Sequence, residues 1–200
     1  MSDPALASRD DWDAHWEHYA DSARDNPAQL MRHHLIARLL AKDERVAGMR
    51  ILDLGSGQGD LLQKLDPIFP DAELAGVELS ERGIAIAKRK VPRAHFFVGD
   101  IFDPPPPLET LSGWGSHAVC SEVLEHVDDP AAFLEHAGKY LTAGGRLVVT
   151  VPGGPMSALD RHIGHRQHFD RDGIRAILER ARYRVNEPTW QASPFSICIG

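Results

Sequence analysis

Between residues 48 and 152, short apolar runs alternate with longer segments in which apolar residues recur every three or four positions. Short runs bounded by turn residues are typical of buried parallel strands, and the periodic segments are typical of amphipathic helices. Five strands are predicted, at residues 50–54, 74–77, 95–98, 116–120 and 147–151. This alternation predicts an α/β fold, with a doubly wound, mostly parallel sheet and helices on both faces.

Helix start and stop signals lie between these strands. Asp129-Pro130 places a capping residue before a proline suited to the first turn of a helix, and Gly144 is typical of a helix end. The predicted helices cover residues 58–68, 80–87 and 129–143. Segment 103–115 contains four consecutive prolines and is predicted to be loop.

The two ends of the chain carry weaker patterns. Residues 11–43 are predicted to form two helices that meet at Asn26-Pro27, the second packing onto the sheet. We therefore expect residues 1–43 to form an N-terminal helical cap and residues 44–200 to form the main domain.

Beyond strand 147–151 we expect a loop, a helix and two closing strands. A glycine- and histidine-rich loop, 153–169, precedes a helix capped by Asp170. Residues 183–185 and 195–199 are predicted as the closing strands. The last strand ends almost at Gly200, which raises the expectation that the natural chain continues beyond it.

Composition narrows the class of protein. With 200 residues, 42% hydrophobic and 26% charged, the chain suits one globular domain with a cap, and no apolar run reaches the length of a membrane span. The first residues are acidic and polar, unlike a secretory signal. Cys120 and Cys198 make neither a disulfide framework nor a metal motif, so we expect a cytoplasmic protein. A net charge of −7 disfavours a nucleic-acid partner.

Polar or glycine-rich residues follow four of the predicted strands. They are Gly55 to Gly59, Glu78, Asp100 and the pair Ser121-Glu122. In an open parallel sheet, ligands bind beyond the carboxyl ends of the strands. The convergence of these four segments at one edge predicts a ligand site there.

The glycine spacing indicates which ligand this site takes. A dinucleotide fingerprint starting at Gly55 needs glycine or alanine at its sixth position, which is Asp60, and the chain has no P-loop. The acid at Asp60 would repel a phosphate but would attract a cationic ligand. This spacing disfavours a nicotinamide oxidoreductase and favours S-adenosylmethionine, which has an ammonium, a sulfonium, a ribose and an adenine.

Each part of S-adenosylmethionine has a candidate partner. Glu78 is placed to accept both ribose hydroxyls, and Asp100 is placed to accept the adenine amino group. Leu79 and Ile101 offer apolar faces to the ring, and Asp53 is attractive to the cationic end. The alternative is that Glu78 and Asp100 only cap the helices that follow them.

Five ordered motifs carry a resemblance to a known family. They are D-L-G-S-G-Q-G, V-E-L-S, G-D-I-F, S-E-V-L-E-H-V-D-D-P and L-T-A-G-G-R-L-V-V-T-V-P, spread over residues 48–152. The chain resembles class I S-adenosylmethionine-dependent methyltransferases, in the branch of the ubiquinone-biosynthesis O-methyltransferases and related small-molecule enzymes. The resemblance implies a Rossmann-like, seven-stranded sheet with one antiparallel strand. It also implies that Ile101 binds adenine through its backbone, and Arg32 is the counterpart of a cofactor-binding arginine that follows Asn-Pro in some relatives. The expected cofactor-binding residues are Arg32, Asp53, Gly55, Ser56, Gly57, Gly59, Glu78, Leu79, Asp100, Ile101 and Ser121.

A catalytic base is needed only if the methyl acceptor loses a proton. The candidates follow strand 116–120: Glu122, Glu125 and His126. Glu122 and His126 are four residues apart, so on a helical turn they would share a face. We expect His126 and Glu125 to be catalytic. The alternative is that the two glutamates hold the loop through backbone hydrogen bonds while His126 packs under the cofactor.

Three histidines in the loop 153–169 suggest a metal site at first. His162, His165 and His168 are spaced three apart and would line up on a helix. Gly164 weakens that helix, and the arginines beside these histidines would repel a cation. We therefore expect a structural or substrate-contacting loop and no metal ligand.

The expected function is methyl transfer from S-adenosylmethionine to the oxygen of a small molecule. Ser121-Glu122-Val123-Leu124 stands where amino-methylating enzymes have Asn/Asp-Pro-Pro-Tyr/Phe, which disfavours DNA and protein amides as acceptors. Two alternatives stay open: carbon or nitrogen methylation on the same fold, and a cofactor-binding domain without turnover. The sequence identifies neither the acceptor nor the oligomeric state.

Overall fold

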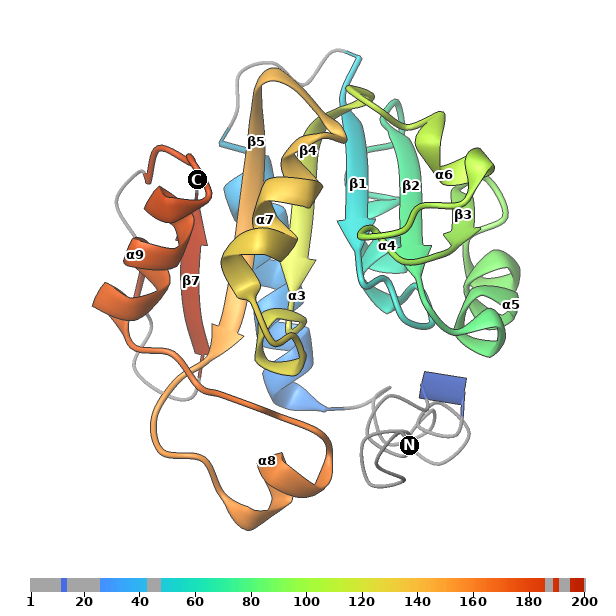
Figure 1. Ribbon diagram of the computed structural model, residues 1–200. Helices are drawn as coiled ribbons and strands as arrows, with labels where there is room; N and C mark the ends of the chain where they lie inside the picture. The colour runs from blue at the N-terminus through green and yellow to red at the C-terminus, as the bar shows by residue number, and fades with distance from the viewer. Residues whose placement is uncertain (1–11, 14–25, 43–47, 186–188, 191–194, 200) are drawn as a thin grey trace.

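A computed structural model describes residues 12–13, 26–42, 48–185, 189–190 and 195–199 (Figure 1). The described strands are β1 (Arg50–Leu54), β2 (Glu73–Glu78), β3 (His95–Val98), β4 (Gly115–Ser121), β5 (Leu141–Pro152), β6 (Thr189–Trp190) and β7 (Phe195–Ile199). The described helices are α3 (Pro27–Leu40), α4 (Asp60–Leu65), α5 (Glu81–Lys90), α6 (Pro106–Glu109), α7 (Pro130–Gly138), α8 (Ala158–His162), α9 (Arg171–Arg180) and the 3₁₀ helix η1 (Leu124–His126).

All described strands lie in one sheet, in the order β3-β2-β1-β4-β5-β7-β6. Strands β1 to β5 pair in parallel, which confirms the mostly parallel α/β fold. β7 pairs antiparallel with β5 and with β6. The chain runs from β1 outward to β3 and then returns to β4 on the other side of β1. The carboxyl ends of β1 and β4 therefore flank the point where strand order reverses, which is where such sheets bind ligands.

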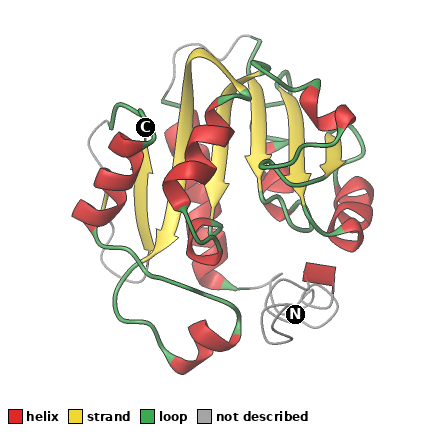
Figure 2. Ribbon diagram, viewed as in Figure 1, coloured by secondary structure: helices red, strands yellow, loops and turns green. Residues whose placement is uncertain are grey.

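Helices cover both faces of the sheet (Figure 2). On one face, Leu52 and Leu54 of β1 join a core with residues of α7 and α9. On the other face, Ile51 joins a core with residues of α3, α4 and α5. Adjacent strand residues thus feed opposite cores, because side chains alternate across a strand. The continuous apolar runs of the sequence follow from this two-sided burial.

The second predicted N-terminal helix corresponds to α3. The Asn26 side chain accepts a hydrogen bond from Ala28 N–H, and Pro27 takes the first helical position, as the sequence indicates. Ile36 and Leu40 of this helix are buried in the core it shares with α4 and α5. Apart from residues 12 and 13, the first predicted helix lies outside the described residues. No described helix is long and apolar enough to cross a bilayer.

Four predicted elements differ from the structure, and one of them is the loop predicted for 153–169, which contains α8. The helix predicted for 129–143 ends at Gly138, and β5 begins at Leu141, which pairs with Gly115 of β4. The tertiary pairing of β5 overrides the helical periodicity. Segment 103–115 contains α6, since proline is tolerated in a first helical turn.

Residues 183–185 are not a strand. Instead, the Tyr183 hydroxyl donates to the Leu134 carbonyl of α7 at 3.0 Å and holds the end of α9 against that helix. The strand after α9 is β6, six residues farther along the chain from Tyr183.

Candidate active site

Two adjoining pockets lie beyond the carboxyl ends of β1, β2, β4 and β5. The first has a volume of about 560 Å³ and the second of about 600 Å³. Both are within the range of small-molecule sites. The residues that line both pockets are Trp12, Gly55, Glu122 and His126. The pockets therefore form one continuous site around the turn that follows β1.

The turn after β1 depends on glycine. Gly55, Gly57 and Gly59 all have positive φ, at 73°, 51° and 76°. A Cβ on Gly55 would lie 2.5 Å from the Val123 side chain, and one on Gly59 would lie 2.9 Å from Ala87. Both the backbone conformation and the space thus exclude larger residues. The turn presents its main chain to the pockets at close range.

Two polar atoms of this turn are buried without partners. Ser56 Oγ and Gln58 Nε2 make no hydrogen bond among the described residues, and both residues line the second pocket. Buried polar groups in proteins are rarely left unsatisfied. These two atoms are therefore available to a polar ligand, as the methionine end of the expected cofactor would be.

Glu78 links the end of β2 to the glycine turn. Its Oε2 accepts from Gly57 N–H at 2.9 Å, and its Oε1 accepts from Ser80 N–H at 3.0 Å. Burial raises the pKa of Glu78, and the backbone N–H donors oppose that rise. A carboxylate has about four acceptor positions, so two remain for a ligand. Ser80, not Glu78, caps α5, because its hydroxyl accepts from Gly83 N–H.

The first pocket also contains the residues expected around adenine. Asp100, Leu79 and Ile101 all line it, and Leu79 is 51% exposed. Asp100 Oδ1 accepts from Phe102 N–H at 2.9 Å, which fixes the turn after β3. Asp100 does not cap a helix, since the residue before α6 is Pro105. The structure thus brings Glu78, Asp100 and the two apolar residues to one pocket.

The two aspartates near the turn differ in environment. Asp53, at the end of β1, is buried and lines the second pocket. Burial, and then the neighbouring Glu78, raises the pKa of Asp53 to about 7. Asp60 forms an ion pair with Lys90 of α5. Its charge is therefore already matched within the protein, unlike the unpaired acid that the sequence suggested.

Glu122 organises the end of β4. Its φ is +56°, an uncommon and costly backbone for a residue with a side chain, and such strain concentrates at functional sites. Its carboxylate pairs with Arg32 of α3 at 3.1 Å and accepts from the Thr150 hydroxyl at 3.1 Å. The Thr150 hydroxyl also lies 2.8 Å from Ser121 Oγ. Arg32 and Ser121 thus both line the second pocket beside Glu122.

Glu122 and His126 do not share a helical face, which corrects the sequence prediction. The positive φ of Glu122 turns the chain before η1 begins at Leu124. Both side chains nevertheless reach both pockets. The His126 ring makes edge contacts with Trp12, at 4.9 Å between centroids, and with His165, at 4.8 Å.

Glu125 is a fully buried carboxyl that lines the second pocket. Neither of its oxygens has a hydrogen-bond partner among the described residues. It therefore does not hold the loop through side-chain hydrogen bonds, as one alternative required. Burial, and then the charge of Glu122, raises the pKa of Glu125 well above its ordinary value. This environment favours the protonated form of the Glu125 carboxyl over the carboxylate.

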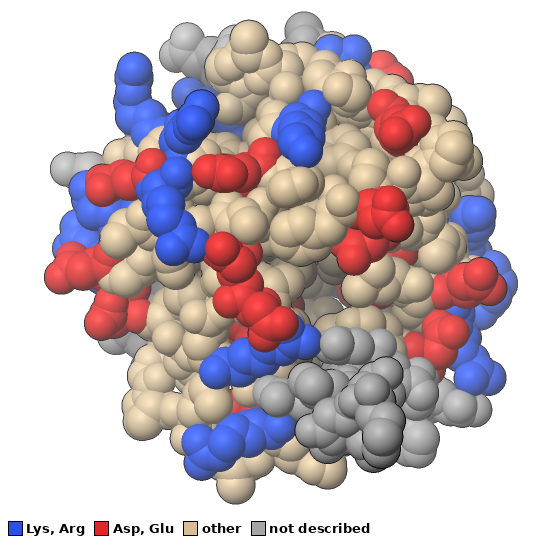
Figure 3. Space-filling model, in the orientation of Figure 1, with Lys and Arg blue, Asp and Glu red and all other residues tan. Residues whose placement is uncertain are grey.

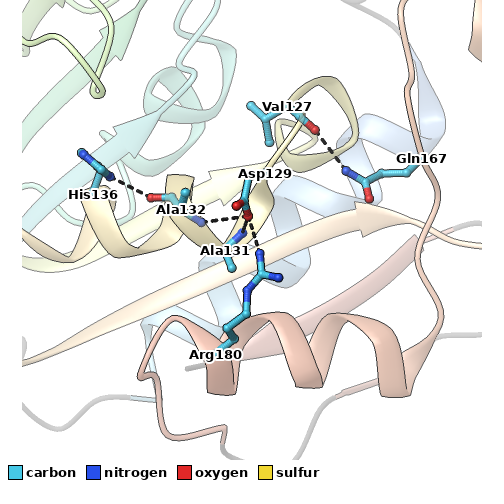
Figure 4. Close-up of polar contacts among 7 residues, drawn as sticks. All are labelled: Val127, Asp129, Ala131, Ala132, His136, Gln167 and Arg180. Atoms are coloured by element: carbon cyan, nitrogen blue, oxygen red, sulfur yellow. Dashed lines mark hydrogen bonds and ion pairs between the residues drawn. The ribbon is translucent and has the colours of Figure 1, made fainter.

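The loop after β5 is fastened beside η1 and α7 (Figure 4). Gln167 Nε2 donates to the Val127 carbonyl at 3.0 Å, and Arg166 N–H donates to the Glu125 carbonyl at 2.7 Å. Asp129 caps α7 and forms an ion pair with Arg180 of α9. These contacts fix the histidines of the loop against the second pocket.

The three loop histidines do not line up as their spacing suggested. α8 ends at His162, which is exposed, and the chain then turns at Gly164. His165 and His168 come together, with 2.9 Å between His165 Nδ1 and His168 Nε2. Asp160, which the sequence interpretation did not single out, joins this pair.

Sequence reasoning did not single out three other residues of the site. They are Trp12 and His33, which line the second pocket, and Thr150, which bonds to Glu122. Thr150 could have been found as a polar residue inside an apolar strand, and Asp160 as the fourth residue of the capping pattern Ser157-x-x-Asp160. Trp12 and His33 carry no local signal, because only the tertiary fold brings them to the pockets.

The chain was compared with known families and proteins. The profile of a family described as a methyltransferase domain matches residues 16–187. A trans-aconitate 2-methyltransferase of Methylobacterium nodulans is 31% identical over 145 residues, which are 71% of this chain and 50% of the relative. The O-methyltransferase cnsE of Penicillium expansum is 26% identical over 188 residues, 88% of this chain and 66% of the relative. The chain thus spans about half to two thirds of these relatives.

A solved structure shares the whole fold. Magnesium protoporphyrin IX methyltransferase from Synechocystis PCC 6803, crystallised with bound SAH, superposes with a TM-score of 0.74. The alignment covers 98% of both chains at 18% sequence identity. This similarity shows the fold.

Gly55→Ala tests the glycine turn, with Gly144→Ala as a matched control. Both glycines have φ +73°, but nothing lies within 4 Å of a Cβ on Gly144. The control is expected to lower the free energy of unfolding by about 1–2 kcal/mol, and Gly55→Ala by about 1–3 kcal/mol more because of the Val123 clash. Urea denaturation measures both, and Val123→Ala should relieve most of the extra loss. Equal losses at the two glycines would contradict the clash.

Asp53 makes stability depend on pH. In the unfolded chain an aspartate has a pKa of about 3.9, whereas Asp53 has one of about 7 in the folded protein. Between these values the folded state keeps a proton that the unfolded state releases, so the free energy of unfolding falls as the pH rises. Denaturation measured from pH 4 to 7 should show that the free energy of unfolding declines as the pH rises. In Asp53→Asn this decline should be smaller, by at most about 4 kcal/mol. Exposed Asp71→Asn is the control, and an unchanged decline in Asp53→Asn would refute the assignment.

Proposed function

Because the chain belongs to the methyltransferase-domain family, we propose that it transfers the methyl group of S-adenosylmethionine to an oxygen of a small-molecule acceptor. The observation that carries this proposal is the Glu78 carboxylate at the end of β2, held by Gly57 and Ser80 N–H groups next to the turn that follows β1. Its two remaining acceptor positions match the two hydroxyls of a ribose.

Each pocket suits a different part of the bound cofactor and acceptor. The first pocket suits the adenosine part, with Glu78 for the ribose and Asp100, Leu79 and Ile101 for the adenine. The second suits the methionine part and the acceptor. Its buried acid Asp53 and the unpartnered Ser56 Oγ support binding of an ammonium and carboxylate. Gly55, Gly57 and Gly59 let the main chain approach both parts, and Arg32 and Ser121 complete the wall through Glu122 and Thr150.

The chemistry needs positioning more than covalent help. When bound, S-adenosylmethionine supplies a methyl carbon already activated by its sulfonium. With both ligands bound, the acceptor oxygen would form the new O–C bond as the S–C bond breaks, and its proton would pass to a ring nitrogen of His126. A general base such as His126 contributes roughly 10²–10⁴-fold to the rate. Glu125 is buried and its pKa is raised, and in its protonated form it can donate a hydrogen bond to the acceptor.

The overall charge supports a small acceptor. The net charge is −7, and the face drawn in Figure 3 mixes acidic and basic side chains. Nucleic acid is bound mainly through cationic contacts to phosphates. The relative named a trans-aconitate 2-methyltransferase supports a small acceptor, and the relative named an O-methyltransferase supports methylation at oxygen. We place this reaction in the cytoplasm.

We further propose that residues 1–43 cap the site and that the complete sheet has seven strands. Trp12 lies against His126, and Asp13 accepts hydrogen bonds from Ser80 Oγ and Arg82 N–H at the start of α5. These contacts of Trp12 and Asp13 support the proposed cap. The antiparallel pairing of β7 with β5 and with β6 supports the proposal of a seven-stranded sheet.

Glu78→Ala tests the cofactor site. S-adenosylhomocysteine should bind the wild type at micromolar or lower concentration, and the variant should bind about 10–100-fold more weakly, because charge-assisted hydrogen bonds are lost. Isothermal titration calorimetry measures both. Glu73→Ala, an exposed glutamate at the other end of β2, is the matched control. Glu78→Asp should retain most affinity, and unchanged binding by Glu78→Ala would remove Glu78 from the site.

His126→Asn tests the proposed base. With an acceptor found by screening phenols, quinone precursors and sugars, kcat should fall about 10²–10⁴-fold. Affinity for S-adenosylhomocysteine should stay within a few-fold of the wild type. A full kcat in the variant would assign His126 to packing. Product analysis by mass spectrometry then tells oxygen from carbon or nitrogen methylation, and cofactor binding without turnover on any acceptor would favour a regulatory domain.

A further inference from the structure

We propose that Asp160, His165 and His168 bind one divalent transition-metal ion, with Zn²⁺ the expected ion, on the loop side of the second pocket. All three residues line that pocket. The site lies on the segment that follows β5, and its three residues do not line the first pocket, which is proposed to hold adenosine.

The three side chains have metal-site geometry. One ligand atom from each lies within 4.8 Å of the other two. His165 Nδ1 is 2.9 Å from His168 Nε2, and His168 Nε2 is 3.8 Å from Asp160 Oδ2. Two nitrogens bound to one Zn²⁺ at its usual distance are roughly 2.9–3.4 Å apart for angles between about 90° and 110°. The histidine pair already has this spacing, and a small rotation of the carboxylate brings the third ligand atom into reach.

His168 is oriented by its second ring nitrogen, and Asp160 is held by the start of α8. His168 Nδ1 lies 3.1 Å from the Gly154 carbonyl, and donation to that oxygen leaves the lone pair on Nε2, the atom that faces His165. Asp160 Oδ2, the oxygen near His168, accepts from Ser157 N–H at 2.6 Å in the capping box of α8, which leaves its second lone pair for a metal ion. Partners of this kind fix the tautomer and position of metal ligands in known sites.

Glu125 adds an unsatisfied polar group beside this site. It is fully buried, and neither oxygen has a partner among the described residues. Its carboxyl forms a second group with His126 and His165, whose ligand atoms lie within 4.8 Å of one another, so the two groups share His165. Burying a carboxyl without a hydrogen bond is costly, and a dication bound at His165 would favour its ionised form in place of the protonated one.

The arginines that the sequence set against a cation do not oppose this site. Arg166 Nη1 is paired with Asp128 at 2.7 Å, and Arg161 is exposed. Two imidazole nitrogens and one carboxylate oxygen suit Zn²⁺ and leave a coordination position open, whereas Mg²⁺ and Ca²⁺ prefer oxygen ligands alone.

The open position gives the ion a role toward the acceptor. It would bind a phenolic, hydroxyl or carboxylate oxygen of the acceptor in the second pocket, beside His126. A bound divalent ion orients such an oxygen and favours its deprotonated form. This role rests on the proposed methyl transfer, but the metal site itself does not.

A metal-free arrangement would satisfy the same contacts. His165 Nδ1–H would donate to His168 Nε2, and His168 Nδ1–H would donate to the Gly154 carbonyl. The two arrangements differ in whether the purified chain retains stoichiometric metal.

The test uses the full chain without an affinity tag. It is stripped with a chelator, exchanged into chelator-free buffer and titrated with Zn²⁺ by calorimetry, and retained metal is measured by mass spectrometry after gel filtration. Visible absorption of the Co²⁺-loaded protein reports on the ligand geometry. The variants are His168→Gln and Asp160→Asn, which keeps a capping side chain. Exposed His162→Gln, from the same loop, is the matched control.

We expect one Zn²⁺ per chain at micromolar or tighter affinity. His168→Gln and Asp160→Asn should each weaken binding by at least about 100-fold, while His162→Gln should stay within about two-fold of wild type. The site would be overturned by any of three results: the wild type binds less than one equivalent of Zn²⁺, His162→Gln loses as much Zn²⁺ affinity as the ligand variants, or the two ligand variants lose no affinity.

S-adenosylhomocysteine binding in the same samples separates the two proposals and checks folding. Binding in all variants shows intact protein. Cofactor binding without metal overturns the metal site and leaves the methyl-transfer proposal standing. Metal binding without cofactor binding supports the metal site and overturns the methyl-transfer proposal.

Discussion

The hydrogen bond from Gly57 N–H to Glu78 holds together the donor half of the site, as we call the residues proposed to bind S-adenosylmethionine. It joins the turn after β1 to the end of β2, so the two neighbouring strands must end at the same level. The positive φ values of the glycines let the backbone turn back toward that carboxylate. Gly55 N–H and Ser56 N–H both donate to the Val77 carbonyl, which fixes the turn a second time. The two pockets open on either side of this junction.

Much of the donor half could be predicted from the sequence, because its residues follow strands directly. Gly55, Glu78 and Asp100 each follow a strand, and parallel strands bring such residues to one edge of the sheet, which the continuous apolar runs and the intervening helices indicate. The acceptor half could not be predicted in this way. Glu122 was assigned to a helical face, but its positive φ places it by a turn that no periodicity encodes. Asp160 reaches the histidines only through the fold of its loop.

Buried acidity gives the site its electrostatic character. Asp53, Glu78, Glu122 and Glu125 all have raised pKa values, and burial is the largest cause for each. Such carboxyls destabilise the folded protein when they ionise, unless a cation or a set of donors compensates. Arg32 compensates Glu122, and backbone N–H groups compensate Glu78. These buried carboxyls thus lower the stability of the folded protein, but they can pair with a cationic ligand.

The loop after β5 is fastened to the segment that carries Glu125 and His126. Arg166 N–H bonds to the Glu125 carbonyl, Gln167 bonds to the Val127 carbonyl, and Phe169 N–H bonds to the Pro152 carbonyl at the end of β5. Because main-chain atoms provide most of these attachments, the side chains of the loop can vary while its path is kept. A homologous chain could therefore exchange this loop and the 3₁₀ segment as one module, changing the acceptor while inheriting the donor pocket unaltered.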